Sequence, residues 1–287
     1  MSDAENVVAS EYPSILGSQM LKLIHRYLAL PNDSPKKIVF VALTLSLVCS
    51  LLVSTAAVIL KPKQQENKRL EQRKNILTVA GLMEDNADID SLFRQVETKV
   101  LDLTSGDYLS DEHTAQIQKR LAERDPKLLI KIPADQDIAQ IKRRSNYTPI
   151  YLIKRNDAID TLVLPVRGYG LWSTLYGFLA LKNDGKTIQG LSFYQHAETP
   201  GLGGEIDNPK WRRQWQGKLA FDEQDQLRIE VVRGKVNADS HQAVHQIDGL
   251  SGATLTSRGV NNLVKYWLSD QGYGTYLKKI WARQTNQ

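Results

Sequence analysis

The stretch TLYGFLALKNDGKTIQGLSFY, residues 174–194, decides the fold class of this chain. Two runs rich in apolar, aromatic and β-branched residues, 174–181 and 188–194, are typical of β-strands. Between them lies Asn183-Asp184-Gly185, a sequence that favours a tight turn between paired strands. The stretch therefore predicts a β-hairpin.

The same alternation of strand-like runs and turn residues extends outward from this hairpin. Further strand-like runs occupy 161–166 and 227–232. Amphipathic patterns predict helices over 64–81, 90–101, 114–129 and 257–270, with Gly81 as a cap that ends the first of them. The sequence therefore predicts an α+β fold, in which helices and strands form one mixed α/β domain.

The longest apolar run is IVFVALTLSLVCSLLVSTAAVIL, residues 38–60, which contains 23 residues and no charge. At about 1.5 Å per residue a helix of this length crosses a hydrocarbon core of ~30 Å. A cleaved signal peptide is the alternative, but its apolar region is shorter, about 7–15 residues, and a long polar segment does not precede it. We expect a single, uncleaved transmembrane helix.

Four segments follow from this assignment. A polar N-terminal segment, 1–37, precedes the transmembrane helix, 38–60; a helical linker or subdomain, 61–145, leads to the main soluble domain, 146–287. Residues 20–28 are amphipathic, and they lie either on the membrane surface or against a partner, or else belong to a tail without fixed structure. Lysine and arginine are slightly more numerous after the apolar run than before it, which weakly favours a cytoplasmic soluble domain.

Composition excludes several classes of protein. The net charge of +5 is mild, and no basic stripe with interleaved aromatic residues indicates binding to nucleic acid. The one cysteine, Cys49, can form neither an internal disulfide nor a thiolate metal cluster. His241 and His245 have the spacing of two metal ligands on a helix, but no third ligand is evident, and we expect no metal site.

Three glycine-rich stretches are candidates for a binding site: 168–173 (GYGLWS), 196–205 (HAETPGLGGE) and 248–257 (DGLSGATLTS). The first places two glycines beside aromatic residues, which suits either a flat ring or an ordinary turn. The second allows consecutive N–H groups to face an anion, although its carboxylates suit a sugar-like hydroxyl chain better. It lacks the frame of a dinucleotide-binding motif.

The third stretch is rich in hydroxyl groups at the expected start of a helix. A helix N-terminus favours a negative group, and Arg258 adds positive charge four residues after Thr254. Simple capping by Thr256 or Ser257 is the alternative, but capping requires only one hydroxyl. Ser251 does not lie in the Gly-x-Ser-x-Gly pattern of hydrolases. We expect this chain to contain no catalytic nucleophile and no general acid.

Taken together, the single N-terminal span and the motifs Gly168-Tyr-Gly-Leu-Trp, Glu198-Thr-Pro-Gly-Leu-Gly203 and Asp248-Gly-Leu-Ser-Gly-Ala-Thr254 resemble a known family. They are similar to those of the C subunit of the Na⁺-translocating NADH:quinone oxidoreductase, with related motifs in the G subunit of Rnf-type electron-transport complexes. The resemblance covers most of the chain from the apolar run onward. It implies a soluble FMN-binding domain and an electron relay rather than an independent catalyst.

The resemblance also implies particular residues. A flavin transferase would link FMN through a phosphoester to Thr254, within a recognition sequence that contains Asp248, Ser251, Gly252 and Ala253. The ribityl chain or the ring edge would contact Glu198, Thr199, Gly201, Leu202 and Gly203. Leu171 and Trp172 would lie near the isoalloxazine ring, and Arg258 near the phosphate.

The resemblance further implies a bacterial inner-membrane protein with its soluble domain in the periplasm, against the weak charge bias, beside the other members of a six-subunit respiratory complex. Two alternatives remain: the G subunit of an Rnf-type complex, and a membrane-anchored scaffold without redox function. Spacing alone does not decide between Thr254 and Thr256 as the attachment site.

Overall fold

The computed structural model describes residues 22, 25–83, 88–123, 125–156 and 158–285. Most of the expected N-terminal segment, 1–37, lies outside these residues, as do residues 20, 21, 23 and 24 of the amphipathic patch at 20–28. The chain divides into two units, residues 1–67 and 68–287. The functional candidates from sequence all lie in the second unit.

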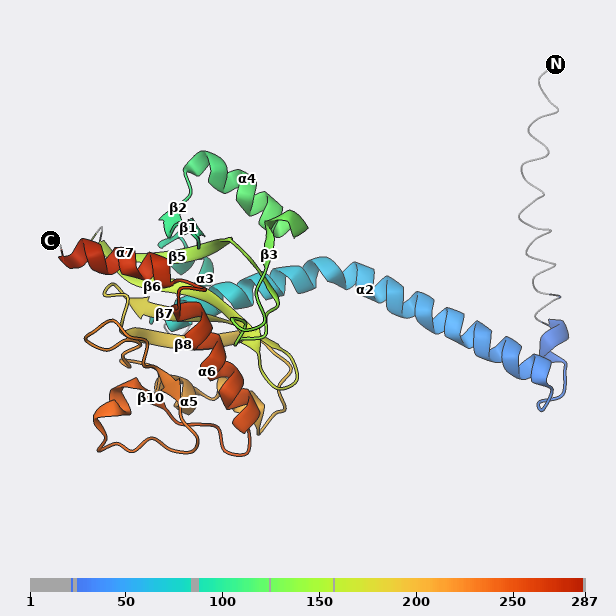
Figure 1. Ribbon diagram of the computed structural model, residues 1–287. Helices are drawn as coiled ribbons and strands as arrows, with labels where there is room; N and C mark the ends of the chain where they lie inside the picture. The colour runs from blue at the N-terminus through green and yellow to red at the C-terminus, as the bar shows by residue number, and fades with distance from the viewer. Residues whose placement is uncertain (1–21, 23–24, 84–87, 124, 157, 286–287) are drawn as a thin grey trace, which may run out of the picture. The chain divides into compact units, whose positions relative to one another are not determined.

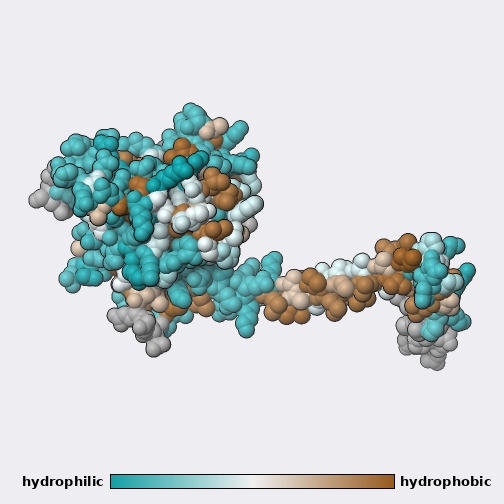
Figure 2. All heavy atoms as spheres, turned by 90° about the horizontal axis from the view of Figure 1, so that it is seen from below, coloured by the Kyte–Doolittle hydropathy of each residue, from teal (hydrophilic) through white to brown (hydrophobic). Residues whose placement is uncertain are grey.

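The apolar run forms part of a long helix, α2 (Pro35–Val79). Its most apolar window has a mean hydropathy of 2.4 and is not buried by any part of the described chain, so this helix is long and apolar enough to cross a membrane. Figure 2 shows the apolar residues as a band along this helix. The helix predicted over 64–81 is the continuation of α2, and it ends before Gly81, whose φ of +72° supports the predicted cap.

A six-stranded antiparallel sheet forms the centre of the second unit (Figure 1). Its strand order is β2-β1-β5-β6-β7-β8. The bounds are β1 (Val96–Asp102), β2 (Asp107–Tyr108), β5 (Tyr147–Arg155), β6 (Ala158–Tyr169), β7 (Thr174–Lys182) and β8 (Ile188–Gln195). The three strands predicted over 161–166, 174–181 and 188–194 are thus confirmed as the neighbouring strands β6, β7 and β8.

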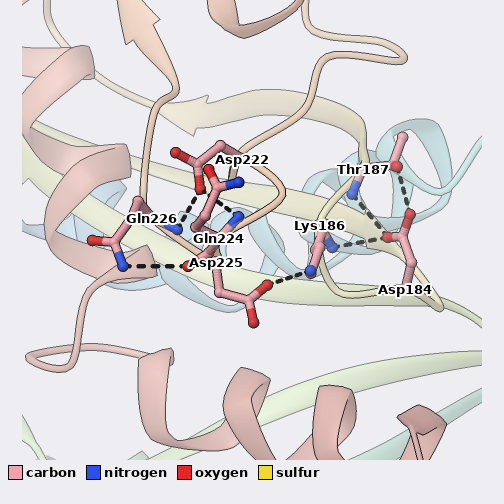
Figure 3. A network of polar contacts seen from close by, with 7 residues as sticks. All are labelled: Asp184, Lys186, Thr187, Asp222, Gln224, Asp225 and Gln226. Carbon is pink, nitrogen blue, oxygen red and sulfur yellow. Dashed lines mark hydrogen bonds and ion pairs between the residues drawn. The ribbon is translucent and has the colours of Figure 1, made fainter.

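The predicted hairpin turn joins β7 to β8. Gly185 has a φ of +65°, and the Asp184 carboxylate accepts hydrogen bonds of 2.8 Å from the backbone N–H groups of Lys186 and Thr187. Lys186 also forms an ion pair with Asp225 in a second turn, whose backbone is held by Asp222 (Figure 3). The bonds to Asp184 stabilise the tight turn that the residues Asn183-Asp184-Gly185 indicated.

Three sequence predictions of secondary structure were wrong in part. Within 90–101 only the residues of α3 (Ile89–Phe93) are helical, and residues 96–101 belong to β1, which pairs along its whole length with β5. The helix predicted over 114–129 is α4 (Asp111–Ala122) followed by the 3₁₀ turn η1 (Pro126–Leu128) and β3 (Leu129–Lys131), which pairs with β4 (Arg143–Ser145). Pro126 lacks an N–H and disfavours helix in the residue before it.

The third partial error concerns 227–232, of which only β9 (Glu230–Val231) is a strand, in a parallel pair with β10 (Gln246–Ile247). Pairing with distant strands, rather than local preference, decides the secondary structure of these segments. Strand β1 has the sequence VETKVLD, whose apolar residues at positions one, five and six also fit a helical period.

Both faces of the sheet are covered. One face packs the end of α2, through Ile76, Leu77 and Val79. The opposite face packs α6 (Thr254–Leu268) and α7 (Gly274–Thr285), together with the segment that contains η2 (Gly203–Asp207), α5 (Pro209–Arg213) and η3 (His241–His245). The α6 helix, predicted over 257–270, lies directly on β6.

Close packing between α6 and β6 depends on small residues. A Cβ on Gly168 would lie 2.8 Å from the Leu263 side chain, and one on Gly259 would lie 2.5 Å from the Tyr169 carbonyl oxygen. This packing carries the end of β6 and the start of α6 to the same edge of the domain, where two of the glycine-rich stretches lie.

Replacing Leu263 by alanine tests this packing. Leu263 is fully buried in the main core, so Leu263→Ala is expected to lower the free energy of unfolding by roughly 2–5 kcal/mol. Leu255→Ala, in the same helix but at a residue that is 50% exposed, should change it by less than about 0.5 kcal/mol. Denaturant unfolding of the soluble domain measures both; equal effects would show that α6 is not held through this face.

Candidate functional site

The three glycine-rich stretches meet at one buried carboxylate, that of Glu198. The first stretch turns between β6 and β7, the second follows β8, and the third leads into α6. Glu198 is only 5% exposed, and it belongs to the second stretch. Its side chain contacts both of the other stretches, so it joins three segments that are far apart in sequence.

The contacts of Glu198 are specific hydrogen bonds. Backbone N–H groups of Leu171, Trp172 and Ser173 donate to Oε1 at 3.1, 3.0 and 3.3 Å. The Thr256 hydroxyl donates to Oε2 at 2.6 Å. A carboxylate offers about four acceptor positions, and these donors fill them. Glu198 therefore holds the 171–173 turn against the first turn of α6.

These contacts also fix the ionisation of Glu198. Burial alone raises the pKa of the carboxyl, but the hydrogen bonds from Thr256 and from the three N–H groups outweigh burial. The pKa of Glu198 consequently lies below its ordinary value, and the residue carries a negative charge at neutral pH.

The start of α6 differs from the sequence prediction. The helix begins at Thr254 rather than near Ser257, and Ala253 occupies the cap position without a side-chain hydrogen bond. The alternative, that Thr256 or Ser257 simply caps the helix, is wrong. Thr256 donates to Glu198, and Ser257 Oγ accepts from the Leu250 N–H at 2.9 Å. The N-terminus of α6 therefore lacks a side-chain cap, and its positive dipole end remains available.

The two candidate threonines have opposite environments. Thr254 is exposed, whereas Thr256 is fully buried. Thr254 borders a cavity of about 260 Å³, and Arg258, one turn further along the exposed face of α6, borders it too. The other residues around this cavity are Glu230, Val231, Val232, Arg233, Gly234, Gly249, Leu250, Ser257 and Asn261.

Arg233 and Asn261 are residues that sequence reasoning missed. Arg233 follows β9 and has no motif around it that indicates a binding role. Asn261 lies two turns into α6, and its side-chain oxygen accepts from the Val231 N–H at 3.1 Å. This bond holds the 230–234 segment beside α6, a contact that only the folded chain reveals.

The third stretch is held by partly buried contacts. Asp248 accepts from the Val236 N–H at 2.8 Å, and its carbonyl oxygen accepts from the Trp211 indole at 2.8 Å. Gly252 has a φ of +71°, a conformation that few other residues adopt, and a Cβ there would lie 3.2 Å from Leu202. Ser251 and Gly252 are both exposed.

The second stretch packs closely on the third. A Cβ on Gly203 would lie 2.5 Å from the Thr256 hydroxyl, so only glycine fits. The carbonyl oxygen of Thr199 accepts from the N–H groups of Leu202 and Gly204 at 3.1 and 2.9 Å. Gly201 has a φ of +75° and faces open space, and the Leu202 side chain is exposed. The predicted residues of this stretch thus lie beside the start of α6.

Two apolar residues of the site face solvent. Trp172 is 65% exposed although it is a large aromatic residue, and Leu171 beside it is half-buried. His241 and His245 lie apart from this site, in η3, where His245 Nδ1 contacts the Leu219 carbonyl oxygen at 2.7 Å. The structure therefore joins the three glycine-rich stretches through Glu198 and places the histidine pair elsewhere, in η3.

Replacing Glu198 by glutamine tests whether this carboxylate joins the stretches. It also tests how its contribution to the free energy of unfolding changes with pH. Because the folded pKa is lowered, the ionised carboxylate stabilises the fold above the unfolded pKa, and this stability is lost as pH falls through the folded pKa. Glu198→Gln should lower the free energy of unfolding by roughly 2–4 kcal/mol near pH 7, and the difference from the wild type should shrink on acidification.

The matched control for this prediction is Glu205→Gln, a half-buried residue of the same stretch that accepts one bond from Asn208 at 2.6 Å. Denaturant unfolding at several pH values measures both variants. A Glu198→Gln penalty that does not depend on pH would contradict an ionised carboxylate at this position.

Comparison with known proteins gives a consistent result. The model of the FMN-binding domain family matches residues 170–269, which include all three stretches apart from Gly168 and Tyr169. The C subunit of the Na⁺-translocating NADH-quinone reductase of Pseudomonas aeruginosa is 48% identical over 253 residues, covering 87% of this chain and 97% of that protein. Its counterpart in Vibrio anguillarum is 45% identical over 249 residues, covering 87% and 96%.

Solved structures agree with the sequence relatives. The crystal structure of Shewanella oneidensis NqrC matches with a TM-score of 0.67 and 30% identity, covering 76% of this chain and 99% of that one. The relatives are named as components of an oxidoreductase complex. Because they are far more than 30% identical over nearly their full length, this chain belongs to the C-subunit family of the Na⁺-translocating NADH-quinone reductases.

Proposed function

We propose that this chain is a membrane-anchored flavoprotein subunit that relays electrons through FMN, held by a phosphoester at Thr254, within a Na⁺-translocating NADH-quinone reductase. The observation that carries the proposal is the contrast between two threonines in one helical turn. Thr254 is exposed at the uncapped start of α6, and Thr256 is buried against Glu198. An enzyme that attaches a cofactor can reach only the first in the folded domain.

The surroundings of Thr254 fit the phosphate of FMN. A phosphoester keeps a negative charge, which the dipole of a helix N-terminus stabilises. Arg258 lies on the same exposed side of α6, and Arg233 lines the same cavity of about 260 Å³. Both guanidinium groups can pair with phosphate oxygens. This support is independent of the family resemblance.

The remaining residues fit the rest of FMN. We assign the backbone of Gly201–Gly203, exposed at Gly201 and Leu202, to the ribityl chain, together with Thr199. We assign the apolar side chains of Leu171, Trp172 and Leu202 to the ring. The carboxylate oxygens of Glu198 already accept hydrogen bonds from the protein. We therefore assign Glu198 the role of positioning the turn that carries Leu171 and Trp172, rather than of contacting FMN. When bound, FMN supplies the electron chemistry, and the chain supplies position and charge.

The assembly and location follow from the relatives. We assign the chain to the bacterial inner membrane through α2, with its second unit in the periplasm, beside the other members of a six-subunit complex, and we assign maturation to a flavin transferase. The matching relatives are named as C subunits of the Na⁺-translocating enzyme, which favours this assignment over the G subunit of an Rnf-type complex. The FMN-binding family match disfavours a scaffold without redox function.

Alanine variants of the two threonines test the attachment site in the native host. Thr254→Ala should remove the mass of FMN minus water from the intact protein and abolish the ultraviolet-excited fluorescence of the denatured band. Thr256→Ala should keep the flavin, with lower stability because Glu198 loses its hydroxyl donor. Mass spectrometry of intact protein and peptides measures the attachment.

Two results would contradict the proposal. A wild-type protein of unmodified mass would exclude covalent FMN, and a flavin retained in Thr254→Ala but lost in Thr256→Ala would reverse the site assignment. Circular dichroism of each variant separates loss of attachment from loss of the fold.

A further inference from the structure

A second cavity system lies on the second unit, and none of its lining residues belongs to the site around Thr254. An outer cavity of about 570 Å³ adjoins an inner one of about 240 Å³. The two share Leu121, Leu129, Arg167, Tyr176 and Tyr194, so they form one groove. The walls come from the end of α2, the α4–η1–β3 segment, and the sheet strands β6, β7 and β8.

The groove contains two arginines, Arg144 and Arg167, that have no carboxylate partner among the described residues. Arg144, in the inner cavity, is only 8% exposed; its Nη1 donates to the Ser145 carbonyl oxygen at 3.3 Å and to Asn146 Oδ1 at 3.0 Å, but its Nε has no acceptor. Arg167 Nη2 donates to the Arg143 carbonyl oxygen at 2.6 Å. Within the described ranges, neither Arg144 nor Arg167 forms an ion pair with a carboxylate.

The acidic residue at the groove cannot supply the missing charge. Asp125 lines the outer cavity, but Arg120 donates to it at 2.8 Å and the Lys127 N–H at 2.9 Å. Lys68, which also lines the outer cavity, adds a further positive charge. Burying a guanidinium group without an anion is costly, so the charges of the groove are complementary to a negatively charged occupant.

The shape of the groove favours a chain segment over a compact anion. The inner cavity has apolar walls, including Pro165, Val166 and Trp267, around the buried guanidinium group of Arg144, which suits a single inserted side chain. The outer cavity is larger and has the rings of Tyr176 and Tyr194, 6.4 Å apart, on one wall. Tyrosine and arginine are among the residues that most often dominate the binding energy of protein interfaces.

We infer that this groove binds an acidic segment of another subunit, with one carboxylate side chain directed to Arg144 and Arg167 and the adjoining residues along the tyrosine wall. The identity of the partner as a member of the same complex rests on the proposed function. The groove thereby adds an interaction surface separate from the flavin site.

A photocrosslink in the assembled complex tests the groove. The photoreactive residue p-benzoylphenylalanine is placed at position 176, and the adduct formed on irradiation is sequenced by mass spectrometry. We expect an adduct with a peptide of another subunit that contains aspartate or glutamate. Arg167→Glu in the same background should lower the adduct yield about tenfold, because like charges then oppose each other. Lys182→Glu, an exposed reversal outside the groove, should leave the yield unchanged.

A second variant separates loss of binding from loss of folding. Arg144→Met removes a buried charge that lacks an anion, so the isolated full-length chain should remain as stable as the wild type while the adduct yield falls. An adduct with lipid alone, no protein adduct, or equal yields from the wild type and Arg167→Glu would overturn the inference. Flavin fluorescence of the same bands is recorded in parallel, because its presence shows that covalent flavin is retained whether or not the adduct yield falls.

Discussion

The buried carboxylate of Glu198 is the interaction on which the site depends. It accepts from the N–H groups of the turn between β6 and β7 and from the Thr256 hydroxyl in α6. Without it, these buried or half-buried donors would lack partners, and the two segments would lose their shared acceptor. The closely packed glycines follow from this arrangement, since Gly170 and Gly203 leave room for the carboxylate that any Cβ would occupy.

The same interaction divides the hydroxyl groups of the third stretch by role. The Thr256 hydroxyl donates to Glu198, and the Ser257 hydroxyl accepts from the Leu250 N–H, so both stabilise the fold. Thr254, two residues earlier, projects into solvent from the first turn of the same helix. Residues two apart on a helix point about 200° away from each other, which explains how neighbouring threonines have such different environments.

Strand and helix prediction succeeded where local pattern and tertiary contact agreed. The hairpin of β7 and β8 has turn residues and apolar strands that both specify it, and α6 has one continuous apolar face. Prediction failed for β1, because its apolar spacing also fits a helix and only pairing with β5 decides between them. It also failed at the start of α6, since the Thr256 and Ser257 hydroxyls find tertiary partners in place of capping.

The sequence by itself determined the apolar helix, the α+β character of the soluble part and the three glycine-rich stretches, because each depends on residues close together in the chain. Only the tertiary structure decided which threonine is accessible, that Arg233 and Asn261 border the same cavity, and that Arg144 and Arg167 lack an acidic partner among the described residues. These properties depend on contacts between distant segments, such as Glu198 with Thr256. Burial and charge pairing arise only when distant segments meet in the fold. The local sequence pattern does not encode which segments meet.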